Sequence, residues 1–253
     1  MSGHSKWANI KHKKAKADAQ RGQTFSKLTK EIVMAARRGG GNLEFNLRLK
    51  TAVQRAREAN IPMDTITRAI KKGTGELEGV NYEELTYEGY GPGGVAMMVD
   101  VVTDNRNRAA SEIRYIFSKH GGNMAEAGAV AWMFDKMGYI CIDREDYPQL
   151  GEDEVLALAL EAGANDVKTS DENFELFCGQ DEVESIRTFL MSKGIKPSVA
   201  EVTMVPKTTV KLDESQAEKM LRLMDALEAH DDVQKVYANF DIPEEILERL
   251  AVE

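Results

Sequence analysis

The residues with the clearest chemical potential form a basic segment at the start of the chain. Between residues 1 and 21 the sequence carries six Lys or Arg and a single acid, Asp18. Cations at this density suit the phosphates of a nucleic-acid backbone. Trp7 offers a flat ring that can either stack on a base or pack against the protein. The candidate nucleic-acid-binding residues of this segment are His4, Lys6, Trp7, Lys11, His12, Lys13, Lys14, Lys16 and Arg21.

The charge of the chain is distributed unevenly. Residues 1–75 contain 17 Lys or Arg and 5 Asp or Glu, whereas the rest of the chain contains 16 basic and 37 acidic residues. The two parts therefore carry net charges of +12 and −21, which indicates a basic module that meets a polyanion. The alternative is that the basic part docks on the acidic part of its own chain. Further cations expected at the nucleic-acid surface are Lys27, Arg37, Arg38, Arg48 and Arg55.

A second candidate anion site lies in the segment TDNRNR, residues 103–108. Thr103 or Asp104 is expected to cap a helix at this point. Arg106 and Arg108 then fall in the first helical turn, where the helix dipole disfavours cations but free backbone N–H groups favour an anion. The alternative is that both arginines pair with nearby carboxylates, for which the candidates are Asp100, Asp104 and Glu126.

Patterns typical of catalysis or metal binding are missing from the sequence. The four histidines show no metal-ligand spacing, and neither a C-x-x-C pair nor a G-x-S-x-G elbow occurs. Cys141 and Cys178 each lie in an apolar stretch and are interpreted as small buried side chains in a reducing compartment. We therefore expect a protein that is not an enzyme, with no metal ion and no cofactor.

The stretch GYGPGG, residues 89–94, matches a dinucleotide-binding glycine pattern only in its spacing. That fingerprint requires a helix directly after the glycines, so that the helix N-terminus can hold a pyrophosphate. Here the following residues, VAMMVDVV, have the pattern of a strand. The stretch is thus predicted to be a wide turn between two strands.

Three helices are predicted to position the basic residues of the first 75 positions. Thr24 is expected to cap the first helix, and the glycines at 39–41 to end it. The second ends at the residues 60–62, Asn-Ile-Pro, and the third starts near Asp64 and ends before Gly73. The third helix has few side chains able to read base edges. Its basic residues are Arg68, Lys71 and Lys72.

The rest of the chain alternates strand and helix patterns, which predicts an α+β protein. Residues 138–206 follow the order β-α-β-β-α-β, the ferredoxin-like plan. Strands at 94–102 and 129–134, with helices and a strand near the C-terminus, form a second α/β domain that the first one interrupts. The expected domains are a three-helix basic domain at 1–75, a discontinuous α/β domain at 80–135 plus 207–253, and an inserted ferredoxin-like domain at 136–206.

Four stretches of the chain have the character of a family signature: GHSKWANIKHKKAKADAQRGQTFSKLTKEI (3–32), NIPMDTITRAIKKGTG (60–75), YEGYGPGGVAMMVDVVTDNRNRAASEIRYIFSKHGG (87–122) and AVAWMFDKMG (129–138). These stretches resemble the signatures of the YebC family of bacterial proteins. The resemblance implies a helical domain and two α/β domains around a cleft. It also implies a probable transcriptional regulator that binds DNA, or a translational activator on the ribosome, as described for mitochondrial relatives; no enzymatic activity is attributed to the family. The segment GGGNLEF (39–45) lacks the Asp-Pro that relatives commonly carry there.

The sequence therefore leads to a transcriptional regulatory protein that binds DNA through its basic N-terminal domain. The alternative is a translation factor that binds ribosomal or transfer RNA, and a more remote one is an enzyme that uses the interdomain cleft. No membrane partner is expected, because no apolar run approaches the roughly 18–20 residues of a membrane helix. No small-molecule substrate is expected either. The family signature starts at residue 2 with no transit peptide before it, which points to the bacterial cytoplasm.

Overall fold

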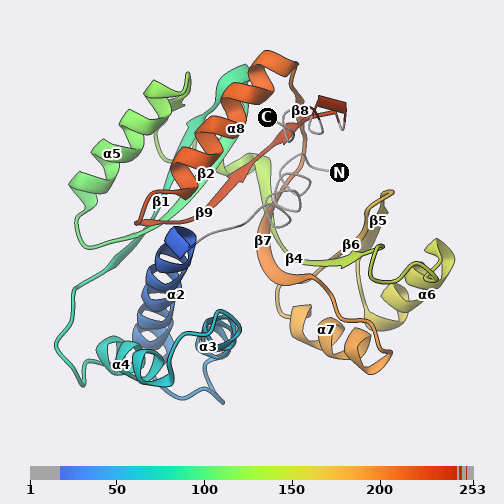
Figure 1. The fold of residues 1–253 in the computed structure, drawn as a ribbon, viewed down its shortest axis with the longest axis horizontal. Coiled ribbons are helices and arrows are strands. Elements are labelled where there is room, and N and C mark those ends of the chain that lie inside the picture. The colour runs from blue at the N-terminus through green and yellow to red at the C-terminus, as the bar shows by residue number, and fades with distance from the viewer. Residues whose placement is uncertain (1–17, 244, 247–248, 250–253) are drawn as a thin grey trace. The chain divides into compact units, whose positions relative to one another are not determined.

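A computed structural model describes residues 18–243, 245–246 and 249, with side chains described from residue 22 onward (Figure 1). The chain forms two compact units. One comprises Trp132–Thr209, and the other comprises the residues up to Ala131 together with those from Val210 onward. None of the helices in the described ranges combines the length and the apolar composition that a membrane-spanning segment needs.

The basic N-terminal part forms a bundle of three helices, α2 (Asp18–Gly39), α3 (Leu47–Glu58) and α4 (Met63–Thr74) (Figure 1). Ile32 of α2, Leu49 of α3 and Ile66 of α4 are almost completely buried in its core. The helices approach closely at Gly73 of α4, where a Cβ atom would lie 2.5 Å from the backbone oxygen of Val33. Burial of these apolar side chains at helical spacing supplies most of the bundle's stability.

Two expected helix ends of this bundle are wrong. Helix α2 runs straight through Thr24 instead of beginning there, because its early turns are held by the end of another helix. Gln23 Nε2 donates to the carbonyl oxygen of Ala229 at 3.0 Å, and Lys27 Nζ donates to that of Glu228 at 2.6 Å. Gly73 lies inside α4, which ends at Gly75 in the left-handed region, with φ of 82°.

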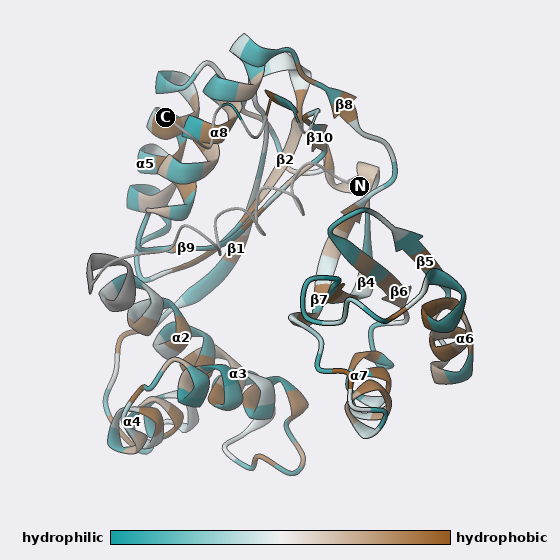
Figure 2. Ribbon diagram, turned by 45° about the vertical axis from the view of Figure 1, so that its right-hand side comes forward, coloured by the Kyte–Doolittle hydropathy of each residue, from teal (hydrophilic) through white to brown (hydrophobic). Residues whose placement is uncertain are grey.

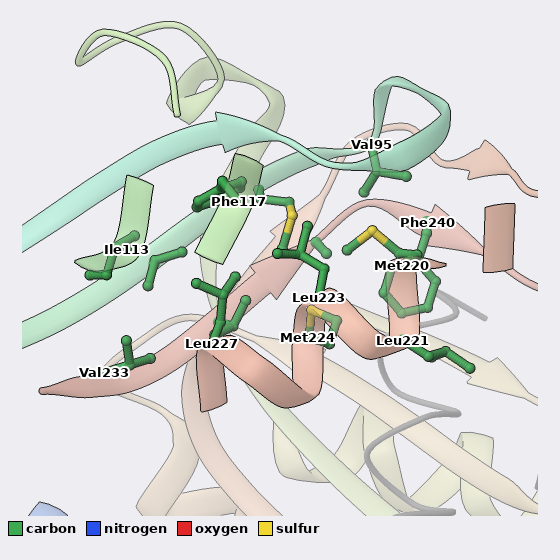
Figure 3. Packing of buried hydrophobic residues seen from close by; sticks show 14 of the residues in the cluster. Val95, Ile113, Phe117, Met220, Leu221, Leu223, Met224, Leu227, Val233 and Phe240 are labelled. Atoms are coloured by element: carbon green, nitrogen blue, oxygen red, sulfur yellow. The ribbon is translucent and has the colours of Figure 1, made fainter. Parts of the chain in front are cut away.

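The body of the same unit is a sheet of order β3-β1-β2-β9 covered on one face by two helices. Strands β1 and β2 pair antiparallel, as do β2 and β9. Side chains of α5 and α8, among them Phe117, Met220 and Leu227, meet on that face in one apolar core (Figure 3). The elements are β1 (Glu83–Tyr90), β2 (Ala96–Thr103), α5 (Arg106–Lys119), β3 (Asn123–Met124), β8 (Val210–Lys211), α8 (Glu214–Glu228), β9 (Val233–Ala238) and β10 (Phe240–Asp241).

The second unit confirms the predicted ferredoxin-like plan. Its strands form a fully antiparallel sheet of order β5-β6-β4-β7, and α6 and α7 pack on one face, where Ile186 of α7 shares a core with Ile140 and Leu176 of the sheet. The α+β fold class expected from the sequence is therefore confirmed. The elements are β4 (Phe134–Asp143), α6 (Glu152–Ala162), β5 (Asp166–Thr169), β6 (Asn173–Cys178), α7 (Val183–Ser192) and β7 (Val199–Pro206).

The strand expected at 129–134 is wrong. This segment wraps around the buried carboxylate of Glu88, which accepts backbone N–H groups from Gly128 and Val130 at 2.7 Å and from Ala131 at 2.9 Å. A short 3-10 helix, η2 (Ala131–Met133), follows, and the next strand begins only at Phe134. Because the carboxylate takes these N–H groups, the segment has none of them left for a strand partner.

The Glu88 carboxylate should contribute strongly to stability. Burial alone would raise its pKa, but the three backbone N–H donors outweigh burial and lower the pKa below its ordinary value. We expect Glu88→Gln to lower the free energy of unfolding by about 1–3 kcal/mol, because the amide puts an NH₂ group against an N–H donor. Urea unfolding at neutral pH measures this effect. Glu126→Gln, an exposed position in the same turn, is the control; equal unfolding midpoints for the two variants would contradict the assignment.

The stretch 89–94 forms the predicted turn. It contains a short 3-10 helix, η1 (Pro92–Gly94), and joins β1 to β2. Gly93 has a φ of 74°, and a Cβ atom there would lie 2.6 Å from Leu212. The glycine is thus required by the backbone conformation and by close packing inside the protein.

Candidate nucleic-acid interface

Lys27 and Arg37 of α2, which the sequence selects as phosphate ligands, have partners within the chain. Lys27 donates to the carbonyl oxygen of Glu228 at the C-terminal end of α8, where the helix dipole favours a positive charge. Arg37 Nη1 donates to the side-chain oxygen of Asn81 at 2.7 Å and to the backbone oxygen of Tyr82 at 2.8 Å. These two residues therefore tie the bundle to the segments that follow it in the same unit.

Three further candidates pair with carboxylates. Arg38 lies 2.5 Å from Glu84 on β1, and Arg48 of α3 binds the other oxygen of the same carboxylate. Arg55 lies 3.9 Å from Glu31. The side chains of Arg38 and Arg48 remain 62% and 43% exposed, so a phosphate can reach them. It would have to compete with the Glu84 carboxylate for both guanidinium groups.

The remaining candidates of the first segment cannot be placed. The side chains of the following residues lie outside the described part of the chain: His4, Lys6, Trp7, Lys11, His12, Lys13, Lys14, Lys16 and Arg21. Their role stays a prediction from the sequence.

Other cations of the bundle are exposed and make no ion pair with any described residue. On α4 they are spaced three and four positions apart, so they are neighbours on the outer side of the helix, away from the buried Ile66 and Ala69. On α3 they are seven positions apart, at one edge of the helix. These residues are Arg68, Lys71 and Lys72 on α4 and Lys50 and Arg57 on α3. None of the five was among the candidates selected from the sequence, although Arg68, Lys71 and Lys72 were noted there as basic residues.

A buried carboxylate, Asp232, joins the basic bundle to the sheet. It accepts hydrogen bonds from Lys30 Nζ at 2.7 Å, Thr103 Oγ1 at 2.9 Å and Arg108 Nη2 at 2.9 Å. Only 6% of the Asp232 side chain and 11% of the Lys30 side chain are exposed. Burial alone would raise the pKa of Asp232, but the hydrogen bonds from Lys30, Arg108 and Thr103 lower it to about 2.

His230 binds the backbone of Asp232 and so helps to position its carboxylate. Its Nδ1 accepts the backbone N–H of Asp232 at 3.1 Å, which leaves the proton of a neutral ring on Nε2. Nε2 lies 2.8 Å from a carboxylate oxygen of Glu112 on α5. No local sequence pattern indicates this arrangement, because Lys30 is 202 positions away from Asp232.

The second candidate anion site is largely occupied by carboxylates. Arg108 lies 2.8 Å from Asp104 and 2.9 Å from Asp232, so the carboxylate pairing left open by the sequence holds for this residue. Arg106 is exposed, and its backbone oxygen accepts the hydroxyl of Tyr87 at 3.2 Å. The predicted cap is wrong: Asn105 caps α5 by accepting from the backbone N–H of Arg108, because Thr103 is bound to Asp232.

Both cysteines are free and buried, as expected. Burial raises the pKa of each thiol to about 11, so neither is a thiolate at neutral pH. Within the described ranges, no three side chains of His, Cys, Asp or Glu are arranged to hold a metal ion.

The fold and the charge pattern define a basic three-helix domain joined to an α+β body that carries a ferredoxin-like insertion. The chain belongs to the TACO1/YebC family: residues 5–76 match the model of the TACO1/YebC protein N-terminal domain, and residues 82–240 match that of the TACO1/YebC second and third domain. This membership confirms the resemblance seen in the sequence.

Full-length relatives agree with this assignment. A protein of Dictyoglomus turgidum named probable transcriptional regulatory protein is 59% identical over 251 residues, covering 99% of this chain and 100% of the relative. One of Syntrophobacter fumaroxidans with the same name is 58% identical over 252 residues, with the same coverage of both chains. The crystal structure of a conserved hypothetical protein, Aq1575 from Aquifex aeolicus, matches with a TM-score of 0.81 and 49% identity, covering 92% of this chain and 95% of that one.

Proposed function

We propose that this protein is a cytoplasmic transcriptional regulator that binds DNA through its basic N-terminal domain. The names of its relatives support a regulatory role, and the net charge of +12 over residues 1–75 supports a nucleic-acid partner. No catalytic step is part of the proposal.

The observation that carries the proposal is the division of the bundle's cations into two groups. In the first group, Lys27, Lys30 and Arg37 of α2 bind groups of the protein itself. Arg68, Lys71 and Lys72 on α4 form an outward cluster whose charges no described carboxylate balances. A cluster of unpaired cations on one helix is costly in mutual repulsion, and a phosphate backbone relieves that cost.

The expected recognition is of the backbone rather than of base sequence. Helices α3 and α4 are joined by residues 59–62, a connection of helix-turn-helix length. However, α4 contains neither Asn nor Gln, the side chains that read adenine in the major groove. Phosphate contacts position a protein on DNA without selecting a sequence, so selectivity in vivo has to come from elsewhere.

A competition experiment tests DNA against RNA as the natural partner. The full chain is bound to a labelled duplex at about 150 mM salt, where non-specific phosphate binding is already weakened. Unlabelled random duplex and purified ribosomes are then added at matched phosphate concentration. We expect the unlabelled random duplex to displace the labelled duplex from the protein at a lower phosphate concentration than the ribosomes do. If the ribosomes release it first and retain the protein through sedimentation, the DNA assignment is wrong and the translation-factor alternative replaces it.

A further inference from the structure

Helix α5 is a basic element within an acidic body. Outside residues 1–75 the chain carries 16 basic and 37 acidic residues, yet α5 contains four basic residues and one acid. The acid, Glu112, is directed to His230 at 2.8 Å, and one of the four cations, Arg108, is directed to Asp232. Figure 2 shows α5 as a mostly hydrophilic ribbon interrupted by hydrophobic residues.

The one acid of α5, Glu112, lies at the edge of its outer face, where it is directed to His230. Ala109, Ile113 and Phe117 are buried against the sheet and define the inner face. At 100° per residue, the positions opposite to them bear amide, hydroxyl, cationic and aromatic groups, all exposed. They are Asn107, Ser111, Arg114, Tyr115, Ser118 and Lys119. We call this set the α5 outer face.

Tyr115 stands at the centre of this face and is 65% exposed. Lys119 Nζ lies 5.9 Å from the centroid of its ring, one turn further along the helix. Arg114, the residue before Tyr115, is exposed as well. Tyr115 therefore has one cation, Lys119, a turn further along the helix and another, Arg114, at the preceding position, while Glu112, three positions before it, is directed to His230.

We propose that the α5 outer face binds a single-stranded stretch of nucleic acid, with one base stacked on Tyr115 and the neighbouring phosphates at Arg114 and Lys119. An exposed aromatic ring with cations close by suits a single strand, because an unpaired base can stack on the ring while the cations bind the backbone. The hydroxyl groups of Ser111 and Ser118 add donors for phosphate oxygens. A regular duplex has no unpaired base to offer this ring.

This inference deepens the proposed function by adding a second contact, selective for unpaired nucleotides, to the phosphate contacts of the bundle. It distinguishes two kinds of variant. Tyr115→Ala removes the stacking surface, whereas Tyr115→Phe keeps it. Arg114→Gln with Lys119→Gln removes two charges and keeps the ring. Leu160→Ala, at a 69% exposed position in the other unit, is a control for the loss of exposed apolar surface.

The test measures the affinity of each full-length variant for a labelled 15-nucleotide single strand and for a 20-base-pair duplex. Stacking on aromatic rings contributes about 1–3 kcal/mol per base, so we expect Tyr115→Ala to weaken single-strand binding roughly 5- to 150-fold. Duplex binding should change less than twofold, and Tyr115→Phe and Leu160→Ala should bind like the wild type. The double charge variant should reduce the salt slope for the single strand by about 1.4. The same strand made as RNA and as DNA shows which sugar the face prefers.

The outcomes separate this inference from the proposed function. If the wild type binds duplex but Tyr115→Ala and the double charge variant bind the single strand as tightly as the wild type, the inference is wrong and the proposed function stands. If the wild type binds single strands through Tyr115 but no duplex, the inference stands and DNA-duplex binding is wrong. If the wild type binds neither, both are overturned.

Discussion

Replacing Asp232 by Asn should lower the free energy of unfolding by about 2–4 kcal/mol. The carboxylate is buried and holds Lys30, Thr103 and Arg108 at 2.7–2.9 Å. Without its charge, the nearly buried ammonium of Lys30 has no counter-charge at this contact, and an uncompensated buried charge is strongly destabilising. Chemical unfolding at pH 7 measures the loss.

Asp231→Asn is the matched control. Asp231 is the preceding residue, its side chain is exposed, and only its backbone oxygen accepts a hydrogen bond from Lys30, at 3.0 Å. Its substitution should change stability by less than about 0.5 kcal/mol. Equal losses of unfolding free energy in the two variants would show that the Asp232 carboxylate does not join the bundle to the sheet.

The same carboxylate predicts a pH dependence. Its pKa is about 2 in the folded protein and about 3.9 in an unfolded chain, so the folded state favours the charged form. Such a group stabilises the protein above pH 4, and this contribution disappears as the pH falls from about 4 to about 2. Over that window the wild type should lose about 2 kcal/mol more than Asp232→Asn does. Parallel curves for the two proteins would contradict the low pKa.

The fold was predictable where local patterns decide it. The ferredoxin-like order followed from alternating strand and helix patterns, and its apolar positions, such as Ile140 and Ile186, proved to be core. The segment 129–134 was not predictable, because its apolar residues have the pattern of a strand while its backbone N–H groups belong to Glu88, about 40 positions away. A side chain that captures the backbone from a distance leaves no local signal.

The sequence predicted which part of the chain carries the candidate interface, but not which of its side chains form it. Charge counting located the basic domain, but it could not separate cations that are free from those that the protein uses itself. Arg38 and Arg48 pair with Glu84 on a strand beyond the bundle, and Lys27 caps a helix about 200 positions away. These partners depend on the tertiary fold. The exposed cations of α4 became the best candidates only after the partners of the others were known.

The cations of α4 should dominate the affinity for duplex among the described residues. We expect the triple variant Arg68→Gln, Lys71→Gln, Lys72→Gln to bind duplex roughly 500-fold more weakly at about 0.1 M salt, since each lost phosphate contact removes about 0.9 units of log K at that concentration. Its thermal stability should be unchanged, because these residues are exposed and unpaired among the described residues. The double variant Arg38→Gln, Arg48→Gln is the control. It should lose less affinity than the triple variant, because it removes two cations instead of three and both already pair with Glu84, whose charge offsets one of them.

The salt dependence of duplex binding tests the central claim most directly. The affinity of the full-length wild type and of the α4 triple variant for one random duplex is measured between about 50 and 300 mM salt. If Arg68, Lys71 and Lys72 each contact a phosphate, the slope of log K against log salt is shallower by about 2.7 in the variant. Parallel lines for the two proteins would mean that these cations meet no phosphate and that α4 is not the nucleic-acid-binding helix.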